Sequence, residues 1–344
     1  MATADKTFRF IVSATPTTAL GQRIASMSPG TWATMSPAPA GIVAAICVGG
    51  SMGNMLAYCN AGSWNPVSKR IEILGQDHGW GNIRHAQYDE ATNTFSFVGN
   101  IGTTEGHGYD HYEVNPSNGD LYWKNYAYGN GGTIGRKPYG GTWTLNFSTV
   151  PTFQQVTGGT CWWRGAFVDV GAHGAFMIYS TQGDGDIQIY NPSGGGWLSG
   201  INNAAPGVNS YHGVMAYSAV KNCAVYGGAN TQTNRAYRLN SDRTITNMPN
   251  TPSGCSIGIY AGCLACDPVT GNFLVLSGGN LFELNPTGAG TWSQLTGSRV
   301  PPAGVNNPSA GANVLWVELP DHGALATISA SGGGSAAMHL YKHA

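Results

Sequence analysis

Short runs of apolar residues recur along the chain, and each run is followed by a polar turn and a second apolar run. In DHYEVNPSNGDLYWKN, which begins at Asp110, the turn NPSNGD separates two segments rich in tyrosine, valine, leucine and tryptophan. Segments of this composition, bounded by Asn, Pro, Gly and Asp, are typical of β-strands joined in a hairpin. The pattern predicts an all-β protein.

The hairpin recurs at a nearly constant interval. Its copies are AGSWNPVSKRIEILG, DHYEVNPSNGDLYWKN, GAFVDVGAHGAFMIYS, GVMAYSAVKNCAVYGG, GCLACDPVTGNFLVLSGG and VLWVELPDHGALATIS. Their turns begin about 50 residues apart, near Asn65, Asn115, Asp169, Ser218, Asp267 and Leu319. Because a hairpin cannot bury a face alone, this period indicates one four-stranded sheet per repeat, covered by its neighbours. We predict a six-bladed β-propeller, with seven blades as the less favoured count.

The last copy reaches the C-terminus too early to hold a fourth strand. PGTWATM, from Pro29, matches GTWTL at Gly141 and GTWSQL at Gly290, which have the outer-strand position in their repeats. We predict that this N-terminal segment completes the last blade, because a closed ring leaves no strand edge open. The predicted organisation is an N-terminal extension over residues 1–28 and a propeller over 29–344, with blades near 56–100, 106–148, 162–200, 210–250, 259–297 and 312–344 plus 29–36.

Glycine pairs follow the second strand of two repeats, at Gly227–Gly228 and Gly278–Gly279, with tyrosine and tryptophan further along. This arrangement resembles the kelch-type propeller of galactose oxidase and the kelch-repeat proteins, over roughly residues 29–344. Leu74–Gly75 and Lys124–Asn125 replace the glycine pair in the first two repeats. The resemblance implies a kelch-like β-propeller.

Composition narrows the class of partner. The chain is 42% apolar, and its 16 Lys and Arg and 17 Asp and Glu leave a net charge of −1. The basic residues are scattered, so no positively charged surface for nucleic acid is expected. The longest apolar run, GIVAAICVGG from Gly41, is too short for a membrane span and is expected to be a buried strand. We therefore expect neither nucleic acid nor membrane as a partner.

The N-terminus and the cysteines bear on location. MATADKTFRFIVSATPTTALGQR lacks a continuous apolar core, so no cleavable signal peptide is predicted. The seven cysteines have no close framework, and we expect most to be buried free thiols, with one or two disulfides left open. The glycine-rich, charge-poor composition resembles that of bacteriophage virion and fibre proteins. That resemblance implies an extracellular or virion-associated location and assembly contacts through residues 1–28.

The candidate site follows from the predicted fold. In a propeller the first strand of each blade lines the central channel, and the segments entering those strands form one mouth, where ligands bind. The predicted ligand-binding residues at this mouth are Tyr58, Asn60, Tyr109, Trp163, His212 and Tyr260. The predicted catalytic residues, if the protein is an enzyme, are His107, His111, Arg164 and Tyr211. In the other interpretation, these bulky side chains only plug the channel.

One kind of catalysis matches these residue types. Breaking a uronic-acid polymer by β-elimination needs a base, an acid and a cation beside the substrate carboxylate. Suitable side chains at the predicted mouth are those of His107, His111, Tyr109, Tyr211 and Arg164. The set is similar to that of propeller-fold ulvan and oligosaccharide lyases, which implies a polysaccharide lyase as the alternative function.

Metal binding is not predicted. His107 and His111 have the spacing of a helical zinc site, but on an extended chain they lie about 13 Å apart. Cys263 and Cys266 form a C-x-x-C without a second pair or a nearby histidine. We predict no metal and no cofactor, and a non-enzymatic recognition or structural module that binds a carbohydrate or protein surface as part of a phage particle.

Overall fold

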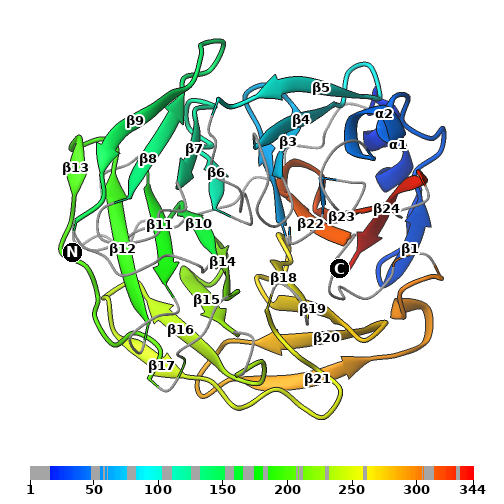
Figure 1. Ribbon diagram of the computed structural model, residues 1–344. Helices are drawn as coiled ribbons and strands as arrows, with labels where there is room; N and C mark the ends of the chain where they lie inside the picture. Colours follow the sequence, from blue (N-terminus) through cyan, green and yellow to red (C-terminus); the bar gives the residue numbers. More distant parts are fainter. Residues whose placement is uncertain are drawn as a thin grey trace, which may run out of the picture.

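Strands grouped in sheets around a common centre make up most of the molecule (Figure 1). The computed structural model describes residues 16–47, 55–56, 59, 61–75, 83–102, 111–124, 132–151, 159–165, 174–180, 185–206, 208, 212–228, 232–258, 262–303, 305, 314–330 and 334–344. Within these ranges the strands form four separate four-stranded sheets and one eight-stranded sheet. The arrangement is that of a β-propeller, as the repeats predicted.

The four separate sheets come from the middle of the chain, and each is an antiparallel meander. The second sheet contains β6 Tyr112–Val114, β7 Leu121–Lys124, β8 Thr133–Lys137 and β9 Thr144–Thr149. The third contains β10 Thr160–Trp163, β11 Ala175–Ser180, β12 Asp186–Asn191 and β13 Gly196–Trp197. The fourth contains β14 Val214–Ser218, β15 Cys223–Gly227, β16 Ala236–Asn240 and β17 Ile245–Asn247. The fifth contains β18 Cys263–Cys266, β19 Phe273–Ser277, β20 Asn280–Asn285 and β21 Thr291–Leu295.

The eight-stranded sheet combines the first and last repeats. The first sheet is β2 Ala61–Asn65, β3 Arg70–Gly75, β4 Arg84–Asp89 and β5 Thr94–Asn100. The last sheet is β22 Val314–Leu319, β23 Ala324–Ala330, β24 Ala336–Lys342 and β1 Thr31–Thr34, with two short 3-10 turns at Gly297–Arg299 and Pro320–His322 nearby. The innermost strands β2 and β22 join the two through parallel pairing of Ala61 with Trp316 and Gly62 with Val317.

Burial along the strands matches their place in the sheet. The innermost strands β10, β14 and β18 are buried along their whole length, because neighbouring sheets cover both of their faces. The outer strand β9 is partly exposed along most of its length. Continuous apolar runs such as TCWW and VMAYS are therefore inner strands. Apolar clusters fill the interfaces between successive sheets around the ring.

The N-terminal strand closes the ring, as predicted from its GTW sequence. β1 pairs antiparallel with β24, with Thr31 opposite Lys342 and Thr34 opposite His339. The Trp32 ring stacks on Tyr341 with centroids 4.6 Å apart, and its indole N–H donates to the Arg299 carbonyl at 2.9 Å. The predicted closure by this segment is confirmed.

Two short helices lie at the rim beside β5 and β24 (Figure 1). The apolar run at residues 41–50 was expected to be a strand, and this expectation is wrong for Ile42–Ile46, which form α2. Gly41 starts α2 in the left-handed region, and the helix buries Ile42, Ala45 and Ile46 on one face. Among the described residues, no helix is both long and apolar enough to cross a membrane.

Part of the predicted N-terminal extension packs on the propeller. Residues 16–28 contain α1, Ala19–Ala25. Thr18 caps its N-terminus, because its side-chain oxygen accepts a hydrogen bond from the Gly21 N–H. Leu20 and Ile24 are buried in the apolar cluster shared by the first and last sheets. This half of the extension therefore contributes to the core.

The third repeat begins earlier than its turn pattern predicted. Its innermost strand is β10, and Trp163 at the end of β10 pairs with Ala175 at the start of β11. The copy expected to start at Gly165 thus omits the true inner strand. The sequence DVGAHG resembles the turns of the other repeats, but the continuous apolar run TCWW is the better sign of a buried strand.

Candidate ligand-binding site

The innermost strands surround a small cavity at the centre of the ring. Its volume is about 40 Å³, and residues from β2, β6, β14, β18 and β22, together with β10 and Arg164 after it, form its wall. Its polar lining groups include Ser63, Glu113, Arg164, Tyr217 and Glu318. Since one water needs on the order of 10–15 Å³ of such volume, the cavity has room for a few waters and not for a sugar ring.

Glu318 is an acid of the channel with a raised pKa. Burial raises the pKa of its carboxyl group from the usual 4.5 to about 7, although the nearby Arg164 guanidinium acts in the opposite direction. Its Oε1 accepts a hydrogen bond of 2.9 Å from the Cys266 N–H. The carboxyl group therefore links β22 to β18 across neighbouring sheets.

Glu113 has a comparable linking position between the first and second sheets. The Ser63 hydroxyl donates to Glu113 Oε2 at 2.9 Å and accepts from the Val114 N–H at 3.0 Å. The Tyr112 hydroxyl donates to the Ala61 carbonyl at 2.9 Å. These bonds hold the inner strands together, which agrees with the interpretation of the described channel residues as a structural plug.

Sequence reasoning did not select Glu113 or Glu318. A signal for both was present, because each is a single carboxylate within an otherwise apolar strand, YEV and VLWVEL. A charged residue on a buried strand usually has a specific partner. The repeat alignment instead directed attention to the segments that enter the strands.

Most of the predicted mouth lies outside the described residues. These positions are Tyr58, Asn60, His107, Tyr109, Tyr211 and Tyr260. Of the described ones, His111 directly precedes β6 and is fully buried, and its carbonyl accepts from the Lys124 N–H at 2.6 Å. His212 lies two residues before β14, is 5% exposed and has a φ of 74° in the left-handed region.

Trp163 and Arg164 differ from their expected placement. Both were expected at the entry to the third inner strand, but Trp163 is the last residue of β10 and Arg164 follows it. Trp163 is fully buried, and its ring lies 4.7 Å from that of Tyr217. The early start of the third repeat, described above, explains this difference.

The corrected placement separates Arg164 from the histidine that it was expected to join. The Thr160 hydroxyl donates to the Tyr112 carbonyl at 3.2 Å, which shows that β6 and β10 begin side by side. His111 lies before this level and Arg164 lies beyond the far end of β10, roughly 16 Å away along the strands at 3.3 Å per residue. The structure therefore does not bring these two predicted catalytic residues together at one mouth.

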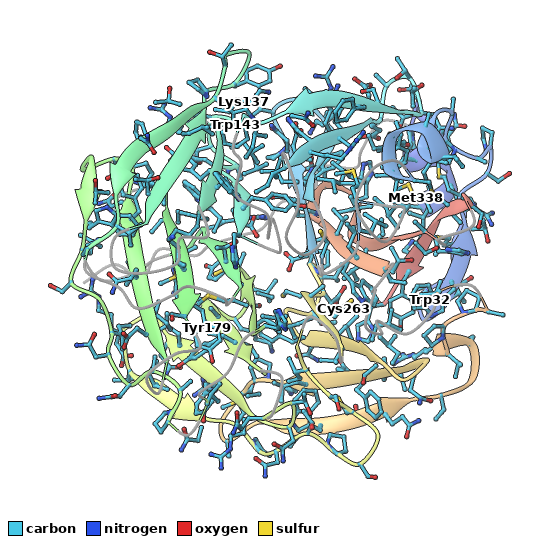
Figure 2. All side chains as sticks on the ribbon, viewed as in Figure 1. Trp32, Lys137, Trp143, Tyr179, Cys263 and Met338 are labelled. Atoms are coloured by element: carbon cyan, nitrogen blue, oxygen red, sulfur yellow. The ribbon has the colours of Figure 1, made fainter. Side chains whose placement is uncertain are left out.

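A larger hollow lies away from the channel, between the first and second sheets. Its volume is about 390 Å³, within the range of roughly 300–1,000 Å³ typical of ligand pockets. Figure 2 shows Lys137 and Trp143 near each other at the outer rim of the second sheet. The lining residues of this rim groove are His85, Val98, Gly99, Asn100, Ile101, Gly102, Lys137, Gly141, Thr142 and Trp143.

Trp143 is the aromatic surface of the rim groove. It packs against the apolar cluster of the first two sheets but remains partly exposed. The His85 ring lies edge-on to it, with centroids 6.4 Å apart, and His85 Nε2 lies 2.7 Å from Glu72 Oε2. Among the described residues, the Trp143 indole N–H has no hydrogen-bond partner. The buried pair of His85 with Glu72 thus supports one side of the indole.

A second hollow of about 440 Å³ lies between the fourth and fifth sheets. Arg238 lines it, but its guanidinium donates to the carbonyls of Pro286 and Gly288 and to Asn240 Oδ1. No aromatic ring is among its lining residues, which include Lys221 and Cys223. The guanidinium of Arg238 is therefore engaged within the protein.

Among the described residues, no group of three or more His, Cys, Asp or Glu side chains could hold a metal ion. Cys263 and Cys266 lie on opposite faces of β18, in different apolar clusters, so they cannot share one ion. All seven cysteines are free thiols, and six of them are buried.

Comparisons with known proteins define the class. No family model and no curated protein matches the chain. A protein of unknown function from Bacteroides thetaiotaomicron superposes with a TM-score of 0.55 and 10% identity, over 91% of this chain and 75% of that chain. An α-L-arabinofuranosidase of Fusarium graminearum with arabinobiose gives 0.51 and 10%, over 83% and 93%. A gluconolactonase from Xanthomonas campestris gives 0.50 and 10%, over 83% and 87%.

These similarities show the fold. The arabinofuranosidase and the gluconolactonase are β-propellers, and together with the ring of sheets they establish this chain as a β-propeller protein. At 10% identity, the ligands and activities of those proteins are not transferred to this chain.

Proposed function

We propose that the protein is a non-enzymatic recognition module, a six-bladed kelch-like β-propeller that binds a carbohydrate or protein surface. Of these two partners, carbohydrate is the one that the rim groove favours. The six apolar clusters between successive sheets support the blade count. The glycine pairs support the kelch likeness, because Gly228 and Gly279 both have left-handed backbones and a Cβ at Gly228 would clash with the Ile257 carbonyl.

One observation favours recognition over catalysis: the difference in volume between two hollows. The cavity that holds the acids of the channel has a volume of about 40 Å³, whereas the hollow with a partly exposed indole has about 390 Å³. Glu113 and Glu318 are engaged in hydrogen bonds between neighbouring sheets. Trp143 offers a flat aromatic surface beside amide, hydroxyl and ammonium groups, a combination suited to binding a sugar ring.

Polysaccharide lyase activity, the alternative function, gains no support from the described residues, because His111 and Arg164 lie at opposite ends of neighbouring strands. Membership of a bacteriophage particle, an extracellular or virion-associated location and assembly contacts through residues 1–28 stay predictions from composition. The buried Leu20 and Ile24 limit such contacts to surfaces other than the inner face of α1.

The test combines binding and turnover. Native gels containing neutral or acidic polysaccharides should retard the wild-type protein, and Trp143→Ala should migrate as in a gel without polysaccharide. The same polysaccharides, incubated with the protein, should show no rise in absorbance near 235 nm, where new unsaturated uronic ends absorb. A rise in that absorbance would overturn the proposal, and retardation by none of the polysaccharides would overturn its carbohydrate form.

A further inference from the structure

We infer that the rim groove selects a saccharide that carries a negative charge. The inference rests on the proposed function and deepens it by naming the class of carbohydrate. It follows from three properties of the groove: an available ammonium group, an aromatic surface, and a floor formed partly by backbone.

The ammonium group is that of Lys137, the last residue of β8. No carboxylate side chain is among the groove's lining residues, and no ion pair of the described residues involves Lys137. Its neighbour Arg136, on the other face of the strand, donates to Asp120 Oδ2 from two nitrogens at 2.8 and 2.6 Å. Lys137 therefore presents a positive charge to the groove that no carboxylate of the described residues neutralises.

The other charged or titratable side chain of the lining does not offset this charge. His85 is held by Glu72 at 2.7 Å, and the Glu72 side chain is buried. The guanidinium of Arg84, the residue before His85, lies 4.2 Å from the centre of the Phe97 ring. Among the described residues, the net charge near the groove is thus positive, which favours the binding of a negative ligand.

The shape and polarity of the groove suit a sugar. A Cβ at Gly99 would meet no atom within 4 Å, and the nearest atom to one at Gly102 is 3.9 Å away, so side chains leave this backbone uncovered. Asn100 and Thr142 supply amide and hydroxyl groups beside it. A sugar ring can lie on the Trp143 indole while its hydroxyls bond to these polar groups and its acidic group approaches Lys137.

A glycan array with matched neutral and acidic glycans tests the inference. Wild-type protein should bind carboxylated or sulfated glycans better than the neutral forms. Lys137→Met should weaken binding to the acidic forms about fivefold, the size expected for one exposed charge pair. Lys221→Met, which removes an exposed charge from the hollow between the fourth and fifth sheets, should change binding less than about twofold. Trp143→Phe should weaken binding to acidic and neutral glycans alike.

The outcomes separate the inference from the proposed function. Equal binding of neutral and acidic glycans, unchanged by Lys137→Met but weakened by Trp143→Phe, would overturn the inference and leave the proposed function standing. Binding of no glycan would overturn the inference together with the carbohydrate form of the proposed function. Binding of an acidic peptide alone would overturn the inference and leave only the protein-binding form of the proposed function. If Lys137→Met does not fold, wild-type binding at increasing salt decides, because attraction to the ammonium group must weaken as ionic strength rises.

Discussion

His343, next to the C-terminus, is joined to Glu283 of the fifth sheet, with its Nε2 3.0 Å from the carboxylate Oε1. The same imidazole has its Nδ1 3.1 Å from the Tyr341 hydroxyl, and Asn272 donates to Glu283 at 2.7 Å. The contact links the end of the last sheet to the sheet before it. It therefore supplements the closure made by β1.

This contact predicts a loss of stability in acid. The hydrogen bond from His343 lowers the pKa of Glu283 below its usual 4.5, so its stabilising effect is present above that value and is lost as the pH falls through the folded-state pKa. Glu283→Gln should lower the free energy of unfolding by about 1–3 kcal/mol at pH 7 and by less at pH 3. Urea unfolding at several pH values measures this. A deficit that does not change with pH would contradict it.

Substitution of Trp32 is expected to show how much ring closure contributes to stability. Trp32→Ala removes the stacking on Tyr341 and the hydrogen bond to Arg299, and it should cost about 2–4 kcal/mol in the free energy of unfolding. Trp292→Ala is the matched control, because this outer-strand indole also donates to a carbonyl, that of Pro249, at 2.9 Å. Only Trp32→Ala should make residues 16–40 susceptible to limited proteolysis in the otherwise folded protein. Equal proteolysis of both variants would argue against a closing role for β1.

Substitution of Glu318 is expected to stabilise the protein above neutral pH. Its folded-state pKa of about 7 lies above the usual 4.5, so the wild-type protein loses stability as the pH rises through this interval. Glu318→Gln keeps an acceptor for the Cys266 N–H and should match wild type at pH 4, but exceed it by on the order of 2 kcal/mol at pH 8. Glu318→Leu, which leaves that N–H without its partner, should gain less. Thermal unfolding at both pH values checks this, and a Gln variant less stable at pH 8 would refute it.

The cysteines predict a two-stage thiol titration. Cys47 is partly exposed, and burial raises its pKa, so it should react with a disulfide reagent first but slowly. Burial raises the pKa of Cys223 to about 11 and that of Cys255 to about 12, so these thiols should react only after denaturation. Cys47→Ser should abolish the early phase. Two or more equivalents reacting in the native protein would contradict the burial of the other six.

The fold could be predicted because its evidence is local. Turns such as NPSNGD and DPVTG, and the apolar segments beside them, set strands and hairpins within a few residues. The similarity of PGTWATM to two other outer strands was sufficient to predict the pairing of β1 with β24. The same reasoning misplaced the third repeat, because a turn-like sequence outweighed the apolar run TCWW.

The candidate site could not be predicted to the same extent. Arg164 was assigned to the wrong end of its strand by the misplaced repeat, so its grouping with His111 did not follow. The rim groove was missed because Lys137 and Trp143 come from one repeat and His85 and Asn100 from another. No spacing in the sequence shows that the edges of two sheets leave room between them.

The sequence by itself determined the repeated hairpins, the all-β class and the strand that closes the ring, because strand period and turn chemistry act between near neighbours along the chain. Tertiary structure alone decided which polar groups share a space. Packing of one sheet on the next occupied the centre with hydrogen-bonded acids such as Glu113 and left the open volume at the rim beside Trp143. The distances between these groups depend on how the sheets pack around the ring, and no single repeat specifies that packing.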